Sequence, residues 1–160
     1  FKQKTAYEIM PSLVGSEMCI RDRCTAQQAY KWTRGRCLFA SGSPFDRVAL
    51  EGKTFVPGQG NNAYIFPGVG LGIVLSRSNL ISDDLFLSAA HTLSSLVSDE
   101  ELSNGQLYPS LSDIRSVSKK IAISVAKKVI SSGLTDIALP KNLEKYLDSI
   151  IYNPEYRDYI

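Results

Sequence analysis

Residues 55–75 read FVPGQGNNAYIFPGVGLGIVL, in which a short apolar run, a polar loop and a longer apolar run follow one another. The loop, Gly58 to Asn62, contains two glycines and three carboxamides. Glycine lets the backbone come close to a ligand, while asparagine offers a hydrogen-bond donor and an acceptor without a net charge. This composition is typical of a binding loop, so Gly58 to Asn62 is the first candidate site.

The segment after this loop is predicted to be a helix that begins near Pro67, because proline suits the first helical position. Gly68, Gly70 and Gly72 invite comparison with the dinucleotide-binding fingerprint, but that pattern requires a glycine where Ile73 stands. Phosphate binding is therefore disfavoured, and the glycines are expected to let this helix pack closely on a sheet.

Two further elements are predicted on the N-terminal side of this stretch from local signals. Thr25 and Gln28 have the spacing of a capping box, which predicts a helix that runs to about Thr33. Residues 48–56 contain a glycine in a turn between two short apolar runs, which predicts a hairpin.

A second candidate site follows a predicted strand. The run Cys37–Ala40 is short, apolar and bounded by turn formers, as expected for a buried strand of an α/β sheet. Ligands in open α/β sheets bind beyond the carboxyl ends of the strands. The loop that follows, Ser41 to Pro44, is therefore a candidate wall of the site.

The C-terminal half is predicted to form three helices, which begin after Ser82, near Ser112 and near Asn142. The second of them is expected to stop at Gly133. The predicted buried face of the first consists of Leu85, Phe86, Ala89, Ala90, Leu93, Leu96 and Val97. The predicted buried face of the second consists of Ile114, Val117, Ile121, Val125 and Ile130.

Titratable residues of the first of these helices have ordinary explanations. His91 lies on its predicted polar face with Ser88, so a solvated histidine is expected rather than a catalytic base or a ligand. Asp83 and Asp84 stand at its N-terminus, where negative charge is favoured by the helix dipole. We therefore assign none of them to a metal or to acid–base chemistry.

Strands and helices come first along the chain, and helices alone follow. This order predicts an α/β fold class, the latter part of a Rossmann-like doubly wound domain over residues 24–133 followed by a helical tail over 134–160. Residues 1–23 have no sustained helical or strand period and read like a translated sequencing adapter. They are interpreted as an artefactual or disordered leader.

Composition argues against several classes of protein. Eighteen Lys and Arg against 16 Asp and Glu give a net charge of only +2, with the basic residues scattered, so nucleic-acid binding is not expected. The apolar stretch Ala63–Leu75 is interrupted by proline and glycine and is shorter than the roughly 20 residues of a membrane span, so no membrane partner is expected. Three cysteines, Cys19, Cys24 and Cys37, without paired close spacing, indicate a reducing compartment rather than disulfides or zinc.

Three segments together resemble the malic enzyme family. They are GRCLFASGSPF at 35–45, FVPGQGNNAYIFPG at 55–68 and GQLYP at 105–109, in the family's order and at similar separations. The resemblance covers residues 24–160, including PEYRDY at 154–159. Arg47 departs from the family, in which a proline is common after the Phe45-Asp46 pair, and this departure touches only a loop.

The resemblance implies a function and a role for each candidate residue. The family oxidatively decarboxylates malate to pyruvate and carbon dioxide, with reduction of NAD or NADP and the help of Mg or Mn. By this resemblance, Asn61 and Asn62 contact malate. Ser41, Gly42, Gly60 and Asn61 would face the cofactor, with Ser43 as support.

The resemblance also implies what lies elsewhere. The tyrosine acid, the lysine base, the metal ligands and the Gly-rich cofactor loop of the family match no segment here, so no catalytic residue and no metal ligand is assigned. Tyr7 and Lys4 are not substitutes, since they fall in the predicted leader. The chain is therefore expected to be an inactive C-terminal fragment. The complete protein is expected to be an intracellular homo-oligomer, a dimer or a tetramer, with the cytoplasm favoured and the mitochondrion and plastid left open.

Two alternatives remain open at this stage. The chain could be a non-catalytic α/β module for oligomerisation or ligand sensing, whose Gly/Asn loop binds a small anion. The loop could also be a structural turn in which Asn61 and Asn62 cap the next element.

Overall fold

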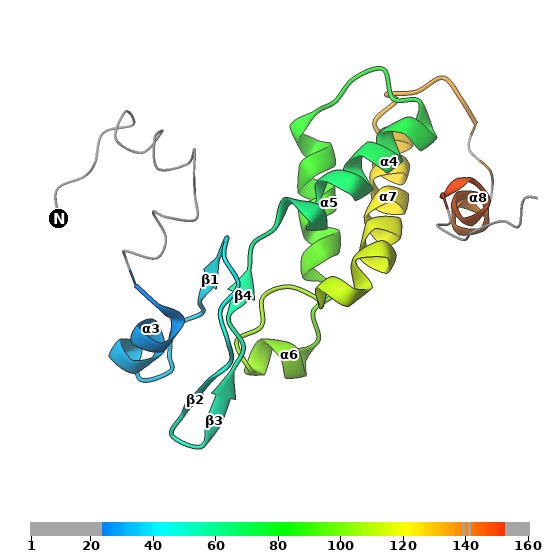
Figure 1. Cartoon of the computed structure of the whole chain (residues 1–160). Helices are drawn as coiled ribbons and strands as arrows, with labels where there is room; N and C mark the ends of the chain where they lie inside the picture. Colours follow the sequence, from blue (N-terminus) through cyan, green and yellow to red (C-terminus); the bar gives the residue numbers. More distant parts are fainter. Residues whose placement is uncertain (1–23, 139, 141, 153–160) are drawn as a thin grey trace, which may run out of the picture. The chain divides into compact units, whose positions relative to one another are not determined.

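The computed structural model describes residues 24–138, 140 and 142–152, which fall into two compact units (Figure 1). The first unit consists of the described residues up to Asn62 together with Leu93–Leu111, and the second of Ala63–Thr92 and the described residues from Ser112 onward. The predicted leader, with Lys4 and Tyr7, and the PEYRDY segment lie outside the described residues.

The first unit begins with helix α3 (Ala26–Thr33), and its predicted capping box is confirmed. The Gln28 amide donates to Thr25 Oγ1 at 3.2 Å, and the Thr25 amide donates to Gln28 Oε1 at 2.9 Å. The two hydrogen bonds satisfy N–H groups that the first helical turn leaves without an intrahelical partner. Tyr30, on the buried side of α3, is fully covered.

Four short strands follow α3 in the described part of the chain. β2 (Val48–Leu50) and β3 (Lys53–Phe55) form an antiparallel hairpin, as predicted. Its two turn residues, Glu51 and Gly52, have φ of 50° and 78°, as a type I′ turn requires. β1 (Ala40–Ser41) and β4 (Gly58–Gln59) pair in parallel.

The prediction of a buried strand at Cys37–Ala40 is wrong. Strand pairing begins only at Ala40, and Leu38 is 63% exposed. Cys37 and Phe39 pack against the cluster formed by Tyr30 and Phe55, while the alternate residues point away from it. The segment is therefore covered on one face only among the described residues, and a continuous apolar run does not by itself specify which faces are covered.

Aromatic contacts hold the first unit together. The rings of Tyr30 and Phe55 stack with centroids 4.6 Å apart, and Phe39 meets Phe45 edge to face at 5.5 Å. Burial raises the pKa of the Tyr30 hydroxyl, with a smaller contribution from Cys37. Within the described part of the chain, the Tyr30 hydroxyl has no hydrogen-bond partner, which leaves a polar atom unsatisfied in this core.

Helix α6 (Asp99–Ser103) has a second capping box, at which we expect a pH-dependent change. The Ser98 amide and hydroxyl both donate to Glu101 Oε2 at 2.8 Å, and they hold the pKa of this exposed carboxyl below its ordinary value. A lowered pKa means that the cap is complete at neutral pH and is lost only as the pH falls through that lowered value.

NMR titration of the Glu101 side chain measures this. Ser98→Ala removes the hydroxyl and keeps the amide, so it should return the pKa part of the way toward its ordinary value. An unchanged pKa in that variant would contradict the role of the hydroxyl.

The second unit is helical. α4 (Phe66–Ser76) carries Pro67 in its first turn, as predicted, and packs along α7 (Ile114–Ser131). The expectation that the α4 glycines face a sheet is wrong, because their neighbour is a helix. A Cβ built at Gly68 would lie 2.7 Å from Ile121 Cβ, and one at Gly72 would lie 2.8 Å from the Ala122 carbonyl oxygen. None of the described helices has the length and apolar character that a bilayer crossing requires.

Helix α5 (Asp83–Ser94) buries most of the predicted face but not all of it. Leu85, Ala89, Leu93 and Val97 are buried as expected, but Phe86 and Ala90 are exposed. On the predicted polar side, the half-buried Ser88 hydroxyl lies 2.9 Å from that of Ser124 on α7, so this side also contacts a neighbouring helix.

Helix α7 shows a smaller error, at Ile130. Val117, Ile121 and Val125 are buried as predicted, but Val129 is buried and Ile130 is 43% exposed. These buried residues recur every four positions, so the next one along the face is Val129 and not its neighbour.

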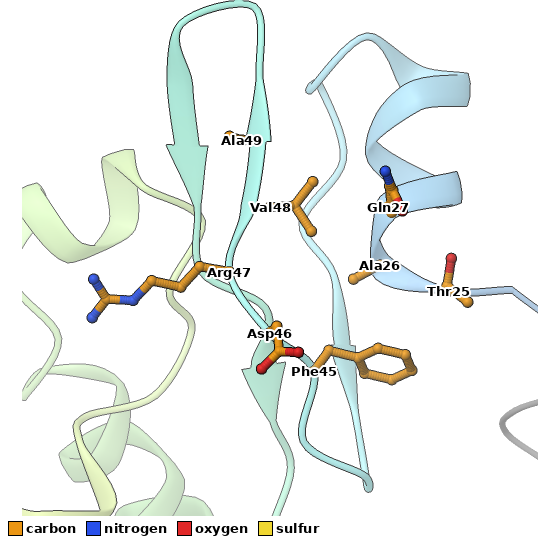
Figure 2. Close-up of a pocket in the computed structure, with 8 residues that line it drawn as sticks. All are labelled: Thr25, Ala26, Gln27, Phe45, Asp46, Arg47, Val48 and Ala49. Atoms are coloured by element: carbon orange, nitrogen blue, oxygen red, sulfur yellow. The ribbon is translucent and has the colours of Figure 1, made fainter.

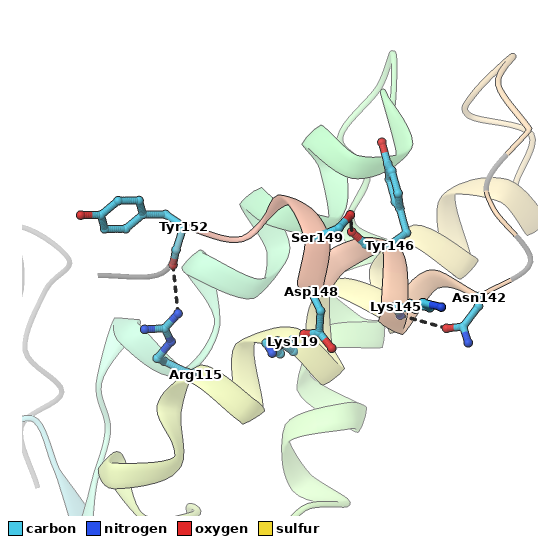
Figure 3. A network of polar contacts seen from close by, with 8 residues as sticks. All are labelled: Arg115, Lys119, Asn142, Lys145, Tyr146, Asp148, Ser149 and Tyr152. Carbon is cyan, nitrogen blue, oxygen red and sulfur yellow. Dashed lines mark hydrogen bonds and ion pairs between the residues drawn. The ribbon is translucent and has the colours of Figure 1, made fainter. Parts of the chain in front are cut away.

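Helix α8 (Leu143–Ile150) docks on this unit through apolar and polar contacts (Figure 3). Leu143 and Leu147 join the buried cluster that includes Leu75, Ala122 and Ala126. Lys119 of α7 pairs with Asp148, and Arg115 Nη2 donates to the Tyr152 carbonyl oxygen at 3.0 Å. The predicted helical tail is therefore attached to α7 as far as residue 152.

Candidate functional site

The two predicted site segments meet in the first unit, because β1 and β4 are parallel neighbours. Ala40 pairs with Gly58 and Ser41 with Gln59, so both strands end at the same edge (Figure 1). The Gly60 amide donates to the Ser41 carbonyl oxygen at 2.8 Å and continues the pairing beyond β4. Residues 41–43 and 58–62, which were predicted separately, thus form one edge.

Gln59 serves the structure of this edge. Its Nε2 donates to the Gly42 carbonyl oxygen at 3.4 Å, while the Ser43 amide donates to Ser41 Oγ at 3.3 Å. These contacts link the loop after β1 to β4. One of the three carboxamides of the polar loop therefore has a structural task.

Asn61 and Asn62 are both exposed, and Asn62 begins a single 3-10 turn, η1 (Asn62–Tyr64). Helix α4 has Ile65 at its N-cap position and no side-chain cap. Neither asparagine therefore caps α4, which removes one form of the structural-turn alternative. Both residues lie at the surface where the two strands end.

A third segment completes the edge, and sequence reasoning did not assign it a role. Tyr108 belongs to the GQLYP motif, and it lies beside Gly58 of β4 and Gly60 just after it. A Cβ built at Gly58 would lie 3.4 Å from Tyr108 Cδ2, and one at Gly60 would lie 3.8 Å from the Tyr108 hydroxyl oxygen. The Val56 amide donates to the Asn104 carbonyl oxygen at 2.9 Å and holds this segment in place. The motif itself was the available signal for Tyr108.

Two hollows formed by described residues lie outside this edge. One, of about 310 Å³, is formed by the start of α3 and by residues 45–49, with Asp46 and Arg47 among its lining residues (Figure 2). The other, of about 520 Å³, lies in the second unit and is lined mainly by apolar residues together with Arg115 and Lys119. Neither is lined by Ser41, Gly42, Gly60, Asn61 or Asn62.

The described residues do not fit a divalent metal or a phosphate loop. They contain no group of three or more His, Cys, Asp and Glu side chains that could hold a metal ion. Gly68 and Gly72 face α7 at contact distance, so their backbone is closed to a phosphate. What this edge offers is neutral hydrogen-bonding groups and close backbone approach.

Comparison with known proteins places this chain in a family. The sequence model of the family "Malic enzyme, NAD binding domain" matches residues 16–130. The NADP-dependent malic enzyme of Populus trichocarpa is 52% identical over 140 residues, which are 87% of this chain and 24% of that protein. The corresponding enzyme of Dictyostelium discoideum is 49% identical over 133 residues, 83% of this chain and 24% of that protein. A chloroplastic NADP-dependent malic enzyme of Oryza sativa subsp. japonica is 49% identical over 137 residues, 85% of this chain and 21% of that protein. The chain spans about a quarter of the length of the curated relatives it matches.

Proposed function

Because this chain belongs to the malic enzyme family through its NAD-binding domain, we propose that it is part of an enzyme that oxidatively decarboxylates malate. The products are pyruvate and carbon dioxide, and NAD or NADP is reduced. The names of the relatives favour NADP. The α/β fold class agrees with this family, with a parallel strand pair followed by helices.

The observation that carries the proposal is the convergence of three segments at one edge. The Gly60 amide, just after β4, donates to the Ser41 carbonyl oxygen at the end of β1, and Tyr108 packs against Gly58 and Gly60. Asn61 and Asn62 emerge from this edge with exposed side chains. A substrate and a cofactor that must touch each other need an edge of this kind.

The proposed task of the asparagines is orientation. A carboxamide donates hydrogen bonds to a substrate carboxylate or hydroxyl without adding a charge. Asn62 would hold malate, and Asn61 would lie between malate and the nicotinamide end of the cofactor. Gly60, Ser41 and Gly42 would border the cofactor, which, when bound, accepts a hydride from the malate carbon that bears the hydroxyl. The acid, the base and the ligands for Mg or Mn would come from the part of the protein outside this chain.

The 160-residue chain alone is expected to show no malate-dependent reduction of NAD or NADP, because the described part holds no metal-binding cluster. The complete protein is expected to reduce the cofactor when malate and a divalent metal are both present. The measurement is the absorbance of the reduced cofactor under identical conditions for both proteins. Metal-dependent turnover by the chain would refute the proposal that the acid, the base and the metal ligands lie outside it. An inactive complete protein would refute the proposed function.

Assembly and location are part of the proposal. The complete protein is proposed to be a homo-oligomer, a dimer or a tetramer, which light scattering on the eluted protein measures directly. We place it inside the cell, in the cytoplasm by preference, while the chloroplastic relatives keep a plastid location open.

A further inference from the structure

Helix α4 has no polar side. From Phe66 to Leu75 not one side chain is polar. A helix that is apolar all round is normally buried all round, because every side that remains in water forfeits the hydrophobic stabilisation. The composition of α4 is therefore that of a core helix.

Among the residues that the structure describes, only one side of α4 is covered. On the side of α7, Val69 is 3% exposed and Leu75 6%, and Gly68 and Gly72 lie in close contact with α7. On another side, Phe66 is 56% exposed and Val74 74%. The coverage of α4 by the described residues is thus incomplete.

The exposed residues of α4 form a stripe. Phe66, Gly70 and Val74 follow one another at intervals of four positions, which places them along one face of the helix. A Cβ built at Gly70 would meet nothing within 4 Å, whereas those at Gly68 and Gly72 would collide with α7. Gly70 leaves on this face the same room for a close neighbour that the other two glycines leave for α7.

The stripe continues onto α5. Phe66 meets Phe86 edge to face with ring centroids 6.4 Å apart, and the next residue, Leu87, is 57% exposed. The exposed apolar residues of α4, Phe66, Gly70 and Val74, with Phe86 beside Phe66 and Leu87 next to it in the chain, are called the apolar patch below. Exposed apolar patches of this kind mark contact surfaces.

We infer that an apolar element of the same polypeptide, from the part outside this chain, packs against this patch. The relatives are about four times as long as the matched region, so most of their polypeptide is available to cover it. Contact surfaces between copies normally have a polar rim, and α4 has no polar residue before its last one. The patch thus resembles part of a domain core whose covering element is missing. We expect that element to come closest to α4 at Gly70, where there is no side chain.

The test is the reactivity of a cysteine placed on the patch. Val74→Cys is made in a background in which Cys19, Cys24 and Cys37 are serine, both in the 160-residue chain and in the complete protein, and a maleimide reagent is applied. The cysteine is expected to react rapidly in the chain. In the complete protein it is expected to react at least about 100-fold more slowly, because reaction then requires local opening. Lys127→Cys, on the exposed face of α7, is the matched control for reagent access.

Each outcome has one meaning. Slow reaction that persists when the complete protein is diluted supports the inference, while slow reaction that dilution abolishes overturns it in favour of a second copy. Reaction at the rate of the chain also overturns it. Leu87→Cys gives the same readout on α5 if Val74→Cys fails to fold. The labelling rate does not depend on enzymatic turnover, so it tests this inference whether or not the proposed function is correct.

Discussion

In the complete protein, Asn62→Ala is expected to lower kcat/KM for malate about 100-fold, the loss typical of removing one well-placed hydrogen-bond donor from a transition state. Asn62 is exposed at the edge where β1 and β4 end, and α4 does not use it as a cap. Removing its carboxamide should therefore cost orientation of the substrate and little stability. Steady-state kinetics with malate as the varied substrate measure the effect.

Gln59→Ala is the matched control. It also removes a carboxamide from the loop, but Gln59 donates to the Gly42 carbonyl oxygen within the protein. Its loss is expected to lower kcat/KM less than about tenfold, because the backbone pairing of Gly60 with Ser41 remains. Unchanged kinetics for Asn62→Ala would contradict the substrate contact and would favour the alternative that the loop is a structural turn.

The second large effect is on folding. Gly72→Ala in the 160-residue chain is expected to lower the free energy of unfolding by about 2 kcal/mol, because the new methyl group collides with the backbone of α7. Its Cβ would lie 2.8 Å from the Ala122 carbonyl oxygen and 2.8 Å from Val125 Cβ. Neither atom is the flexible end of a side chain, so the helices must separate.

Gly70→Ala is the control within the same helix. Nothing lies within 4 Å of the added Cβ, so the higher helix propensity of alanine should raise the stability of the chain by up to about 1 kcal/mol. Urea denaturation followed by far-UV circular dichroism compares the two variants. Equal stability of both would show that α4 and α7 do not pack as described.

Local signals in the sequence predicted local structure well. The capping box of Thr25 and the turn of the β2–β3 hairpin each depend on residues within four positions, and both are confirmed. The buried face of α5 depends on which side meets α7, and the pairing of Ser88 with Ser124 joins residues 36 positions apart. A helical period shows that a stripe exists but not which of its edges will be covered.

The candidate site was predictable in its parts but not in its assembly. The loop 58–62 was predicted from its glycines and carboxamides, and the loop 41–44 from its place after a predicted strand. Ligands of open α/β sheets bind beyond the carboxyl ends of the strands, which favoured the second loop. The register of β1 with β4 and the placement of Tyr108 on Gly58 could not be derived. They depend on contacts between residues that lie 18 to about 50 positions apart in the sequence. The roles of Ser41, Gly42, Gly60, Asn61 and Asn62 stay predictions.

The parallel pairing of β1 with β4 also determines where this protein tolerates changes in length. The pairing fixes Ser41 and Gln59 side by side, whatever path the chain takes between them. Residues inserted at the hairpin turn, Glu51-Gly52, would lengthen a surface excursion at a small entropic cost and leave the edge unchanged. A single residue inserted between Gln59 and Asn62 would instead displace the asparagines from their neighbours. A tag or a reporter peptide is therefore expected to be tolerated at the hairpin turn and not between Gln59 and Asn62.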